Sequence, residues 1–296
     1  MGVALRDILA PYRDPIGWEG LCGAAAIDAH NALYQFLTII RQPDGTPLVD
    51  AEGRVTSHLS GLFFRTTKLL ELGIRPVFVY DGPPPPLKSR TIEARRSVRE
   101  EADRQYAAAV ERGDREEAYR QARAATRIDG GMIESSRRLL DLLGVPWVQA
   151  PSEGEAEAAR LAATGQVAYA VSQDYDSLLF GAPVLARNVT ISGRRRLRGR
   201  TITVEPERIR LAAVLEGLGI GREELIRVGI LVGTDFNEGV RGVGARTALK
   251  LVREGRFEET VAERLPDFDP GPVFEFFCHP PSGGTVHLSW RPPDPD

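Results

Sequence analysis

The chain has 296 residues, of which 42% are hydrophobic and 27% charged, proportions typical of a globular protein with a buried core. No run of 18 apolar residues is present and the first residues do not resemble a secretory signal, so we expect a protein that neither spans a membrane nor is secreted. The formal net charge is −3, but the charges are unevenly distributed, with Arg and Lys concentrated in residues 88–127 and 194–200. This distribution favours a protein with a basic surface that binds phosphates beside an acidic pocket. Cys22 and Cys278 lie far apart and are expected to be free thiols in a reducing cytosol.

The first part of the chain alternates short apolar strands with amphipathic helices. Residues 24–28 are expected to form a strand, followed by a helix from Asn31 whose apolar residues recur every three or four positions. Residues 59–72 predict a second helix and residues 76–81 a second strand, which the four prolines at 83–86 cannot continue.

Residues 88–127 are rich in Arg, Glu and Ala and contain few large apolar side chains. A helix that packs into a core needs an apolar stripe, so this segment is predicted to be a solvated helical excursion from the sheet.

The alternation resumes with a helix over 132–143, a strand over 145–150, a helix over 151–163 and a strand over 167–174. Ser152, three residues before Glu155, is the predicted N-cap of the second of these helices. Strands that alternate with helices predict an α/β fold with a mostly parallel, twisted sheet and helices on both of its faces.

The last third of the chain begins with a predicted hairpin region over 181–204, which has GRRRLRGR (193–200) at its tip. From residue 205 the chain is predicted to be helical, and glycines punctuate the start of a helix within 239–252. After Pro266 no periodicity supports a further element.

Seven acidic residues from five segments are predicted to converge. They are Asp28, Asp81, Glu153, Glu155, Asp174, Asp176 and Asp235. In an open parallel sheet, ligands bind at the carboxyl ends of the strands, and each of these residues follows an apolar run or opens the helix after one. Like charges brought together are costly unless cations neutralise them, and oxygen ligands without Cys or His favour Mg²⁺ or Mn²⁺ over zinc. Two such ions roughly 4 Å apart are a common device for hydrolysing a phosphodiester.

A single Asp after a strand is more often a helix cap or a turn residue, but caps alone do not explain seven carboxylates placed in this way. Glu157 lies four residues from Glu153 on the same helical face, so spacing alone does not exclude it from the set. We interpret Glu157 as a solvated surface residue.

Six segments, in chain order, resemble the motifs of the archaeal and eukaryotic flap endonucleases, which belong to the XPG-type nuclease superfamily. They are AIDAHNALYQFL, TSHLSGLFFRT, PVFVYDGPPPPLK, APSEGEAEAA, SQDYDSLLF and VGTDFNEGVRGVGARTAL. The resemblance covers residues 1 to about 290 and implies a PIN-like nuclease core. It also implies that the metal carboxylates are the seven named above.

Through this resemblance, residues 82–130 are expected to form a helical arch over the active site, through which a 5′ flap passes. Lys88 and Arg95 match basic residues that reach the scissile phosphate, where positive charge stabilises the developing negative charge. Any one Arg of this segment could instead be a solvated charge, and Arg99, on the same helical face as Arg95, is a weaker candidate.

The resemblance also implies DNA contacts outside the arch. Tyr34 matches an aromatic residue that stacks on a base, although its place on an apolar helix also suits the core. Arg41 and Arg65 match residues on helices that face DNA. Residues 235–254 resemble a helix–two-turn–helix that grips duplex phosphates and, in the family, is assisted by K⁺. Its candidate contacts are Gly242, Gly244, Arg246 and Lys250. The arginines of 193–200 are either a second DNA contact or a soluble hairpin tip.

We expect one nuclease domain over residues 1–265, followed by an irregular C-terminal segment over 266–296. Within the domain, residues 1–100 form the N-terminal nuclease region and residues 131–265 the internal nuclease region. The tail with which family members dock on the sliding clamp has no match after Trp290. We expect a monomer in the cytoplasm, or in the nucleus if the source is eukaryotic.

The leading prediction is a Mg²⁺-dependent 5′ flap endonuclease with 5′–3′ exonuclease activity, acting on branched DNA in replication, including Okazaki fragment maturation, and in repair. Mn²⁺ is expected to substitute for Mg²⁺. A different XPG-type junction or bubble nuclease is the nearest alternative, but the insertion between Asp81 and Glu153 has the length of the flap type. A PIN-type ribonuclease would need neither the arch nor the glycine hairpin, and a non-catalytic DNA-binding protein would be expected to lack some of the seven carboxylates.

Overall fold

The mostly parallel sheet predicted from the sequence is present in the computed structural model, which describes residues 2–42, 45–190, 193–197 and 200–294. Within these residues, one sheet has the strand order β1-β9-β6-β5-β2-β3-β4, and β7 pairs with β8 in a separate hairpin. The strands are β1 (Asp14–Pro15), β2 (Gly23–Asp28), β3 (Ile74–Tyr80), β4 (Trp147–Gln149), β5 (Tyr169–Val171), β6 (Val184–Arg187), β7 (Gly193–Leu197), β8 (Arg200–Val204) and β9 (Glu207–Arg210). Strands β6, β5, β2, β3 and β4 run parallel, and β9 and β1 extend the sheet in antiparallel pairing.

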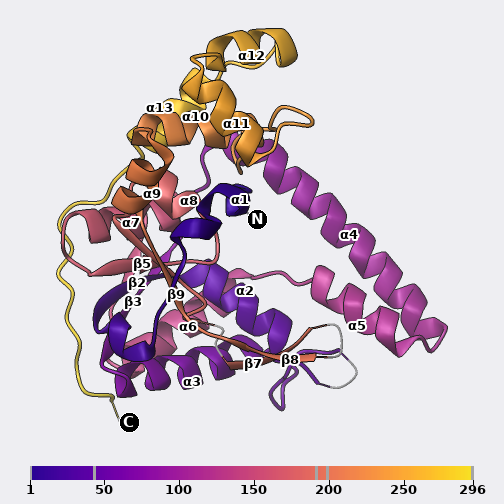
Figure 1. Cartoon of the computed structure of the whole chain (residues 1–296). Coiled ribbons are helices and arrows are strands. Elements are labelled where there is room, and N and C mark those ends of the chain that lie inside the picture. Colours follow the sequence, from indigo (N-terminus) through magenta and orange to yellow (C-terminus); the bar gives the residue numbers. More distant parts are fainter. Residues whose placement is uncertain (1, 43–44, 191–192, 198–199, 295–296) are drawn as a thin grey trace.

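Helices flank this sheet on both faces (Figure 1). The α-helices are α1 (Arg6–Leu9), α2 (Ala29–Ile39), α3 (Ser57–Glu71), α4 (Ser89–Glu111), α5 (Arg115–Ala124), α6 (Gly130–Leu142), α7 (Gly154–Ala163), α8 (Asp176–Leu179), α9 (Leu211–Leu218), α10 (Arg222–Val232), α11 (Ala245–Arg253), α12 (Phe257–Arg264) and α13 (Gly271–Cys278). The 3-10 helices are η1 (Ala10–Tyr12), η2 (Trp18–Leu21) and η3 (Pro86–Lys88). No helix in the described part of the chain is both long and apolar enough to cross a membrane.

The alternation of side chains along β2 divides the interior into two cores. Ala24 and Ala26 lie in a core shared with α7, α9 and α10, whereas Ala25 and Ile27 lie in one shared with α2, α3 and α6. A parallel strand buried on both faces needs apolar residues at every position, which explains the continuous apolar run of this strand.

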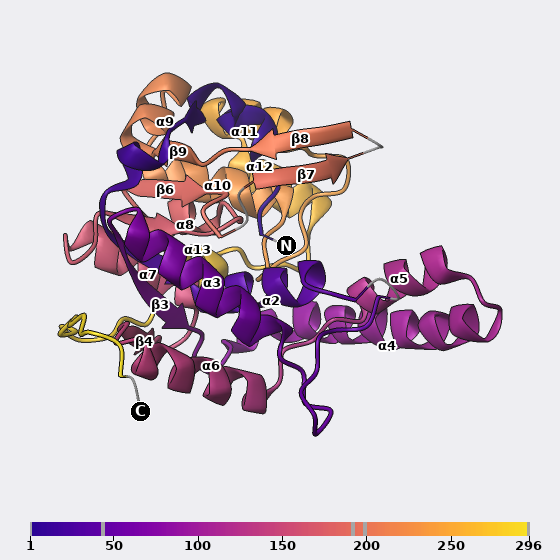
Figure 2. The same ribbon diagram turned by 90° about the horizontal axis from the view of Figure 1, so that it is seen from below.

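The charged segment 88–127 forms two helices, α4 and α5, that lie side by side and project from the rest of the molecule (Figures 1 and 2). Their buried side chains are small or polar: Ala102, Ala109, Ala118 and Gln121. Gln121 Nε2 donates to Gln105 Oε1 at 2.7 Å and so links α5 to α4. The predicted solvated helical excursion is confirmed, and we call α4 and α5 together the arch.

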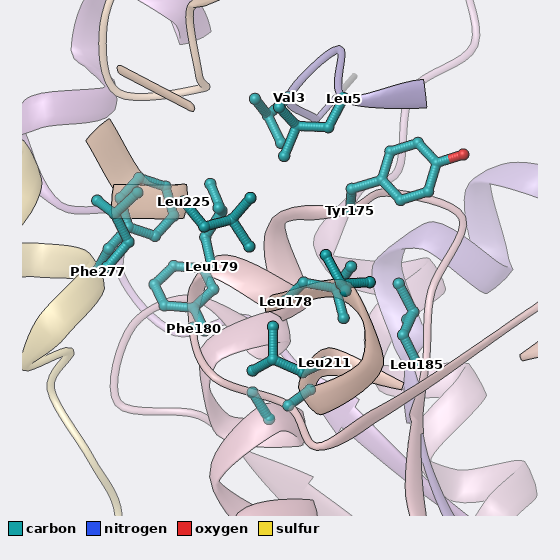
Figure 3. Packing of buried hydrophobic residues seen from close by; sticks show 14 of the residues in the cluster. Val3, Leu5, Tyr175, Leu178, Leu179, Phe180, Leu185, Leu211, Leu225 and Phe277 are labelled. Carbon is teal, nitrogen blue, oxygen red and sulfur yellow. The ribbon is translucent and has the colours of Figure 1, made fainter. Parts of the chain in front are cut away.

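The C-terminal segment 266–296 contains a helix where we expected irregular structure. Phe277 of α13 is fully buried and packs against Phe180, with ring centroids 4.8 Å apart (Figure 3). Val273 and Phe277 form the buried stripe of this helix, and a single i,i+4 pair among prolines was too short a pattern to predict it. Beyond α13, residues 279–294 run as an extended strap, which Trp290 anchors by donating from Nε1 to Pro76 O at 2.9 Å.

Two further local predictions were wrong. Residues 207–210, expected to be helical, form β9, because Glu207 and Ile209 alternate as buried residues along the strand. Helix α7 begins at Gly154 with Glu153, and not Ser152, as its N-cap. The second difference places Glu153 at the start of the helix, beside the strand ends.

Candidate active site

The carboxyl ends of the parallel strands carry most of the predicted acidic residues. Asp28 is the last residue of β2, and Asp81 directly follows β3. Glu153 and Glu155 begin α7 shortly after β4, and the Asp174–Asp176 pair follows β5. Parallel strands end at the same edge of a sheet, so these side chains face one region.

Hydrogen bonds link neighbouring carboxylates in this region. Asn31 donates its backbone N–H to Asp28 Oδ1 at 2.9 Å and its side-chain amide to Asp174 Oδ2 at 3.3 Å. The backbone N–H of Gly154 donates to Asp81 Oδ1 at 2.7 Å. Helices α2 and α7 therefore both begin at acidic side chains, where the free N–H groups of a helix N-terminus stabilise negative charge.

The beginning of the chain also reaches this region. The backbone N–H of Gly2 donates to Asp174 Oδ1 at 2.9 Å, and that of Val3 donates to Asp176 Oδ1 at 2.7 Å. The Val3 side chain is buried in the core close to Leu5 (Figure 3). This packing fixes the two backbone donors against the carboxylates.

Two basic residues complete the site, Lys88 directly before α4 and Arg95 in the first part of α4. Lys88 Nζ lies 2.5 Å from Glu153 Oε2 and 3.6 Å from Asp235 Oδ2. Arg95 Nη2 donates to both carboxylate oxygens of Asp235, at 2.6 and 2.7 Å. Asp235 follows α10 rather than a strand, and these ion pairs connect it to the others. We call the seven predicted carboxylates the acidic cluster.

Burial and mutual repulsion raise the pKa of several carboxyl groups in the acidic cluster. Burial, followed by the charge of Asp81, raises the pKa of Asp28 well above its usual value. Burial, followed by the charges of Asp176 and Asp174, does the same to the pKa of Glu155. Burial is also the main cause that raises the pKa of Asp176 to about 7. The acidic cluster therefore holds more negative charge than its surroundings stabilise, and cations are needed to ionise it fully.

Lys88 and Arg95 supply part of the positive charge that the acidic cluster needs. Burial by itself would lower the pKa of Lys88, but the charges of Glu153 and Asp235 outweigh it and raise the pKa. Within the described residues, no three His, Cys, Asp or Glu side chains are arranged so that they could hold one metal ion. In this arrangement the two basic side chains pair with carboxylates that metal ions would otherwise neutralise.

His30 also lies in the site. The sequence predicted a metal site with oxygen ligands and no His or Cys. His30 Nδ1 is 3.1 Å from the backbone N of Asp81 and 3.2 Å from Asp81 Oδ2. The available signal was its position in the first turn of α2, two residues after Asp28. The acidic cluster thus has one imidazole beside it.

The prediction that Glu157 is a solvated surface residue is wrong. Its side chain is 1% exposed and pairs with Arg160 at 2.6 Å, and its Oε2 also accepts a hydrogen bond from the backbone N–H of Gly283 at 3.3 Å. The C-terminal strap covers this face of α7, and a contact across 126 residues leaves no pattern in the local sequence.

The predicted DNA-contacting residues of α2 and α3 differ in their exposure to solvent. Tyr34 is 43% exposed and lines a cavity of about 670 Å³ together with Tyr119 and Arg123 of α5, so its interpretation as a core residue is wrong. Arg41 donates to Leu37 O at 2.9 Å and to Gly45 O at 2.7 Å, so in this arrangement its guanidinium ties α2 to the following loop. Arg65 of α3 is half-buried, and burial lowers its pKa.

Residues 235–254, where a helix–two-turn–helix was predicted, comprise most of the loop after α10 and the whole of α11. Gly242 has a φ of +80°, a conformation that favours glycine, and Gly244 is the N-cap of α11. Arg246 and Lys250 lie one turn apart on the exposed face of α11. Gly242, Gly244 and Arg246 thus lie at or near the N-terminal end of α11, a geometry suited to phosphate binding, and Lys250 follows one turn further along the helix.

The arginine-rich segment 193–200 forms part of the β7–β8 hairpin, as predicted. Residues 198–199 and the side chains of the hairpin lie outside the described residues. The DNA contact considered for these arginines therefore stays a prediction.

Comparisons with known proteins agree with this fold and site. A family model described as the XPG N-terminal domain matches residues 1–102, and one described as the XPG I-region matches residues 144–235. Flap endonuclease 1 of Methanosphaerula palustris is 63% identical over 294 residues, which cover 99% of this chain and 88% of that protein. The structure of flap endonuclease-1 from Methanococcus jannaschii matches with a TM-score of 0.75 at 40% identity, covering 95% of this chain and 86% of that one. The catalytic core of Rad2 in complex with DNA substrate matches with a TM-score of 0.72 at 26% identity, covering 99% and 92%.

The resemblance stated from the sequence motifs is confirmed by these matches, which extend over nearly the whole chain. The order of motifs, the mostly parallel sheet and the helical insertion after β3 all agree with it. The chain belongs to the flap endonuclease family of XPG-type nucleases.

Proposed function

We propose that this chain hydrolyses phosphodiester bonds near the base of 5′ flaps in branched DNA, with an additional 5′–3′ exonuclease activity, in replication and repair. The observation that carries the proposal is that two members of the acidic cluster, Glu153 and Asp235, pair with Lys88, which directly precedes the arch, and with Arg95 of the arch. An excess of buried negative charge beside two basic residues suits a site that binds cations and a phosphate together.

The donor set suits hard divalent cations, because carboxylate oxygens are the ligands that Mg²⁺ and Mn²⁺ prefer. We infer that the acidic cluster holds two Mg²⁺ ions, which Mn²⁺ can replace. The raised pKa values of Asp28, Glu155 and Asp176 support this inference, because they mark charge that lacks a counterion. When bound, the ions would supply an activated water and neutralise charge on the attacked phosphate.

Lys88 and Arg95 are the proposed contacts to the scissile phosphate. Both side chains face the acidic cluster, because Lys88, the N-cap of α4, pairs with Glu153, and Arg95 of α4 pairs with Asp235. In the present arrangement Glu153 and Asp235 accept their hydrogen bonds. A phosphate that enters the site would offer alternative acceptors, and charge held ready there stabilises the transition state without reorganisation.

The duplex is proposed to lie across α11, where Arg246 and Lys250 are exposed after Gly244. Because phosphate contacts position DNA without recognising its sequence, this surface would bind duplex DNA of any sequence. A K⁺ ion in the loop before α11 belongs to the same proposal. Tyr34 is proposed to stack on a base at the cavity between α2 and α5.

A panel of labelled DNA substrates tests the proposed function. The protein is incubated with 5′ flap, 3′ flap, bubble, four-way junction and single-stranded substrates, with and without Mg²⁺. We expect Mg²⁺-dependent cleavage of the 5′ flap close to its base, with slower release of nucleotides from recessed 5′ ends. Preferred cleavage of the four-way junction or the bubble would assign the chain to another branch of the XPG-type nucleases, and no cleavage of any substrate would overturn the proposal.

A further inference from the structure

A line of three polar side chains lies behind Asp174. The side-chain amide of Asn31 donates to Asp174 Oδ2 at 3.3 Å, and that of Gln35 donates to Asn31 Oδ1. Thr190 Oγ1 in turn donates to Gln35 Oε1 at 2.7 Å. The line connects the segment after β5 with α2 and the segment after β6, and it ends on a member of the acidic cluster.

The burial of this line is costly unless each polar atom has a partner. Gln35 is 8% exposed on a helix whose neighbouring residues Ala32, Leu33, Phe36 and Leu37 are buried and apolar, and Thr190 is 4% exposed. An unpaired buried amide or hydroxyl destabilises the fold, so an apolar residue at position 35 would be the simpler solution for packing alone. Both side-chain polar atoms of Gln35 are instead hydrogen-bonded within the line.

The chemistry of the side chains determines which group donates and which accepts in each hydrogen bond of the line. An ionised carboxylate only accepts hydrogen bonds, so Asn31 must present its NH₂ group to Asp174 and its oxygen to Gln35. Gln35 must then present its own NH₂ group to Asn31 and its oxygen to Thr190, whose hydroxyl can donate. Gln35 and Thr190 therefore hold the amide of Asn31 in the orientation that donates to Asp174.

Asn31 also joins two carboxylates of different strands. Its backbone N–H donates to Asp28 Oδ1 while its side chain donates to Asp174 Oδ2, so a single residue relates the end of β2 to the loop after β5. A displacement of Asn31 would change the separation and orientation of both carboxylates.

We propose that Asn31, Gln35 and Thr190 are positioning residues that hold Asp174, and through Asn31 also Asp28, in the arrangement needed for divalent cations. This inference rests on the proposed function. Groups that orient metal ligands in this way typically change metal affinity or activity by about 10- to 100-fold when they are removed.

The test compares Gln35→Met with wild type, because methionine has a similar size but cannot continue the line of hydrogen bonds. Binding of Mn²⁺ to the DNA-free protein is measured by electron paramagnetic resonance, together with the Mg²⁺ concentration that gives half-maximal flap cleavage. Both are expected to weaken by about tenfold, with unchanged binding of flap DNA in Ca²⁺. Gln166→Met, the same substitution in the loop between α7 and β5, is the matched control and is expected to match wild type.

A double-mutant cycle shows whether Gln35 acts through Asn31. Asn31→Ala should reproduce the loss of Mn²⁺ affinity, and adding Gln35→Met to it should cause little further change. Additive losses, or an unchanged Mn²⁺ affinity in both single variants, would overturn the proposal. If Gln35→Met does not fold, Thr190→Val, which keeps the shape of the side chain and removes the donor to Gln35, replaces it in the same cycle.

The wild-type protein separates this inference from the proposed function. If wild type binds Mn²⁺ and cuts the flap while the variants keep its metal dependence, the positioning role alone is wrong. If wild type neither binds Mn²⁺ nor cuts DNA, the proposed function itself is wrong.

Discussion

Lys88 and Arg95 connect the arch to the acidic cluster at the scale of single residues. Lys88 is 14% exposed and its ammonium group lies between Glu153 and Asp235. A lysine buried among carboxylates keeps its charge, and this charge is available to a phosphate that displaces one of its partners. The two basic residues are therefore expected to contribute to catalysis more than to DNA affinity.

Alanine at Lys88 or Arg95 should lower the single-turnover rate of flap cleavage by roughly 10²–10³-fold with little change in DNA affinity. The reason is that the lost charge acts on the transition state. Rapid-quench cleavage and fluorescence anisotropy measure the two quantities. Arg96→Ala is the control, because Arg96 is exposed on the same helix and pairs with Glu100. A variant at Lys88 or Arg95 that binds flap DNA far more weakly but cuts at the wild-type rate would make the residue a phosphate anchor instead.

Metal binding should release protons near pH 6.5. The pKa of Asp176 is raised to about 7 in the metal-free fold, and the pKa values of Asp28 and Glu155 are raised as well, so part of the acidic cluster is protonated at that pH. Cations bind the ionised form and displace the protons. Raised carboxyl pKa values also mean that the metal-free fold loses stability as the pH rises from about 4 to about 7, since the folded state holds the extra protons.

Calorimetric titration with Mg²⁺ in two buffers of different ionisation enthalpy measures this release. We expect more protons to be released near pH 6.5 than above about pH 8.5, because Asp176, with a pKa of about 7, is already ionised at the higher pH before the metal binds. No release at either pH would show that the acidic cluster is already ionised without metal, and equal release at both would show that the displaced protons do not come from a group with a pKa near 7.

At the scale of elements, α11 presents its basic side chains to solvent. Lys250→Ala should weaken the binding of all duplex-containing substrates alike and lower the slope of log affinity against log salt by about one counterion. Binding titrations at several salt concentrations measure both effects. Arg138→Ala, an exposed cation on α6 at a distance from α11 in both views, is the control (Figures 1 and 2). If Lys250→Ala weakened the binding of only one sequence or one branch type, α11 would recognise that sequence or branch structure.

The C-terminal strap and α7 are joined at Glu157. Glu157→Ala removes the partner of Arg160 and of the Gly283 N–H, and it should lower the free energy of unfolding by about 1–3 kcal/mol. Urea denaturation measures the loss. Glu134→Ala, at an exposed position of α6, is expected to leave the stability unchanged. Equal stability of both variants would show that the contacts of Glu157 contribute nothing to the stability of the fold.

At the scale of the whole molecule, the sequence predicted those features that leave a local pattern. Apolar strands alternating with helices gave the sheet, and acidic residues at strand ends marked the acidic cluster, because one rule of sheet geometry brings strand ends together. The contact between the strap and Glu157 joins residues 126 positions apart, and the hydrogen bond between Thr190 and Gln35 joins residues 155 positions apart. No local spacing in the sequence indicates contacts of this kind. Helix α13 was missed because its apolar stripe is only one i,i+4 pair long.

The most direct test of the account is the cleavage of a 5′ flap by Asp174→Ala. Asp174 is held by Gly2 and Asn31 within the acidic cluster, and it makes no ion pair with the arch among the described residues, so its loss should disturb metal binding without releasing Lys88 or Arg95. We predict that the single-turnover rate in Mg²⁺ falls by more than about 10²-fold, while flap binding in Ca²⁺ stays within about threefold of wild type. Cleavage by this variant at the wild-type rate in Mg²⁺ would contradict the assignment of the acidic cluster as the metal-binding active site.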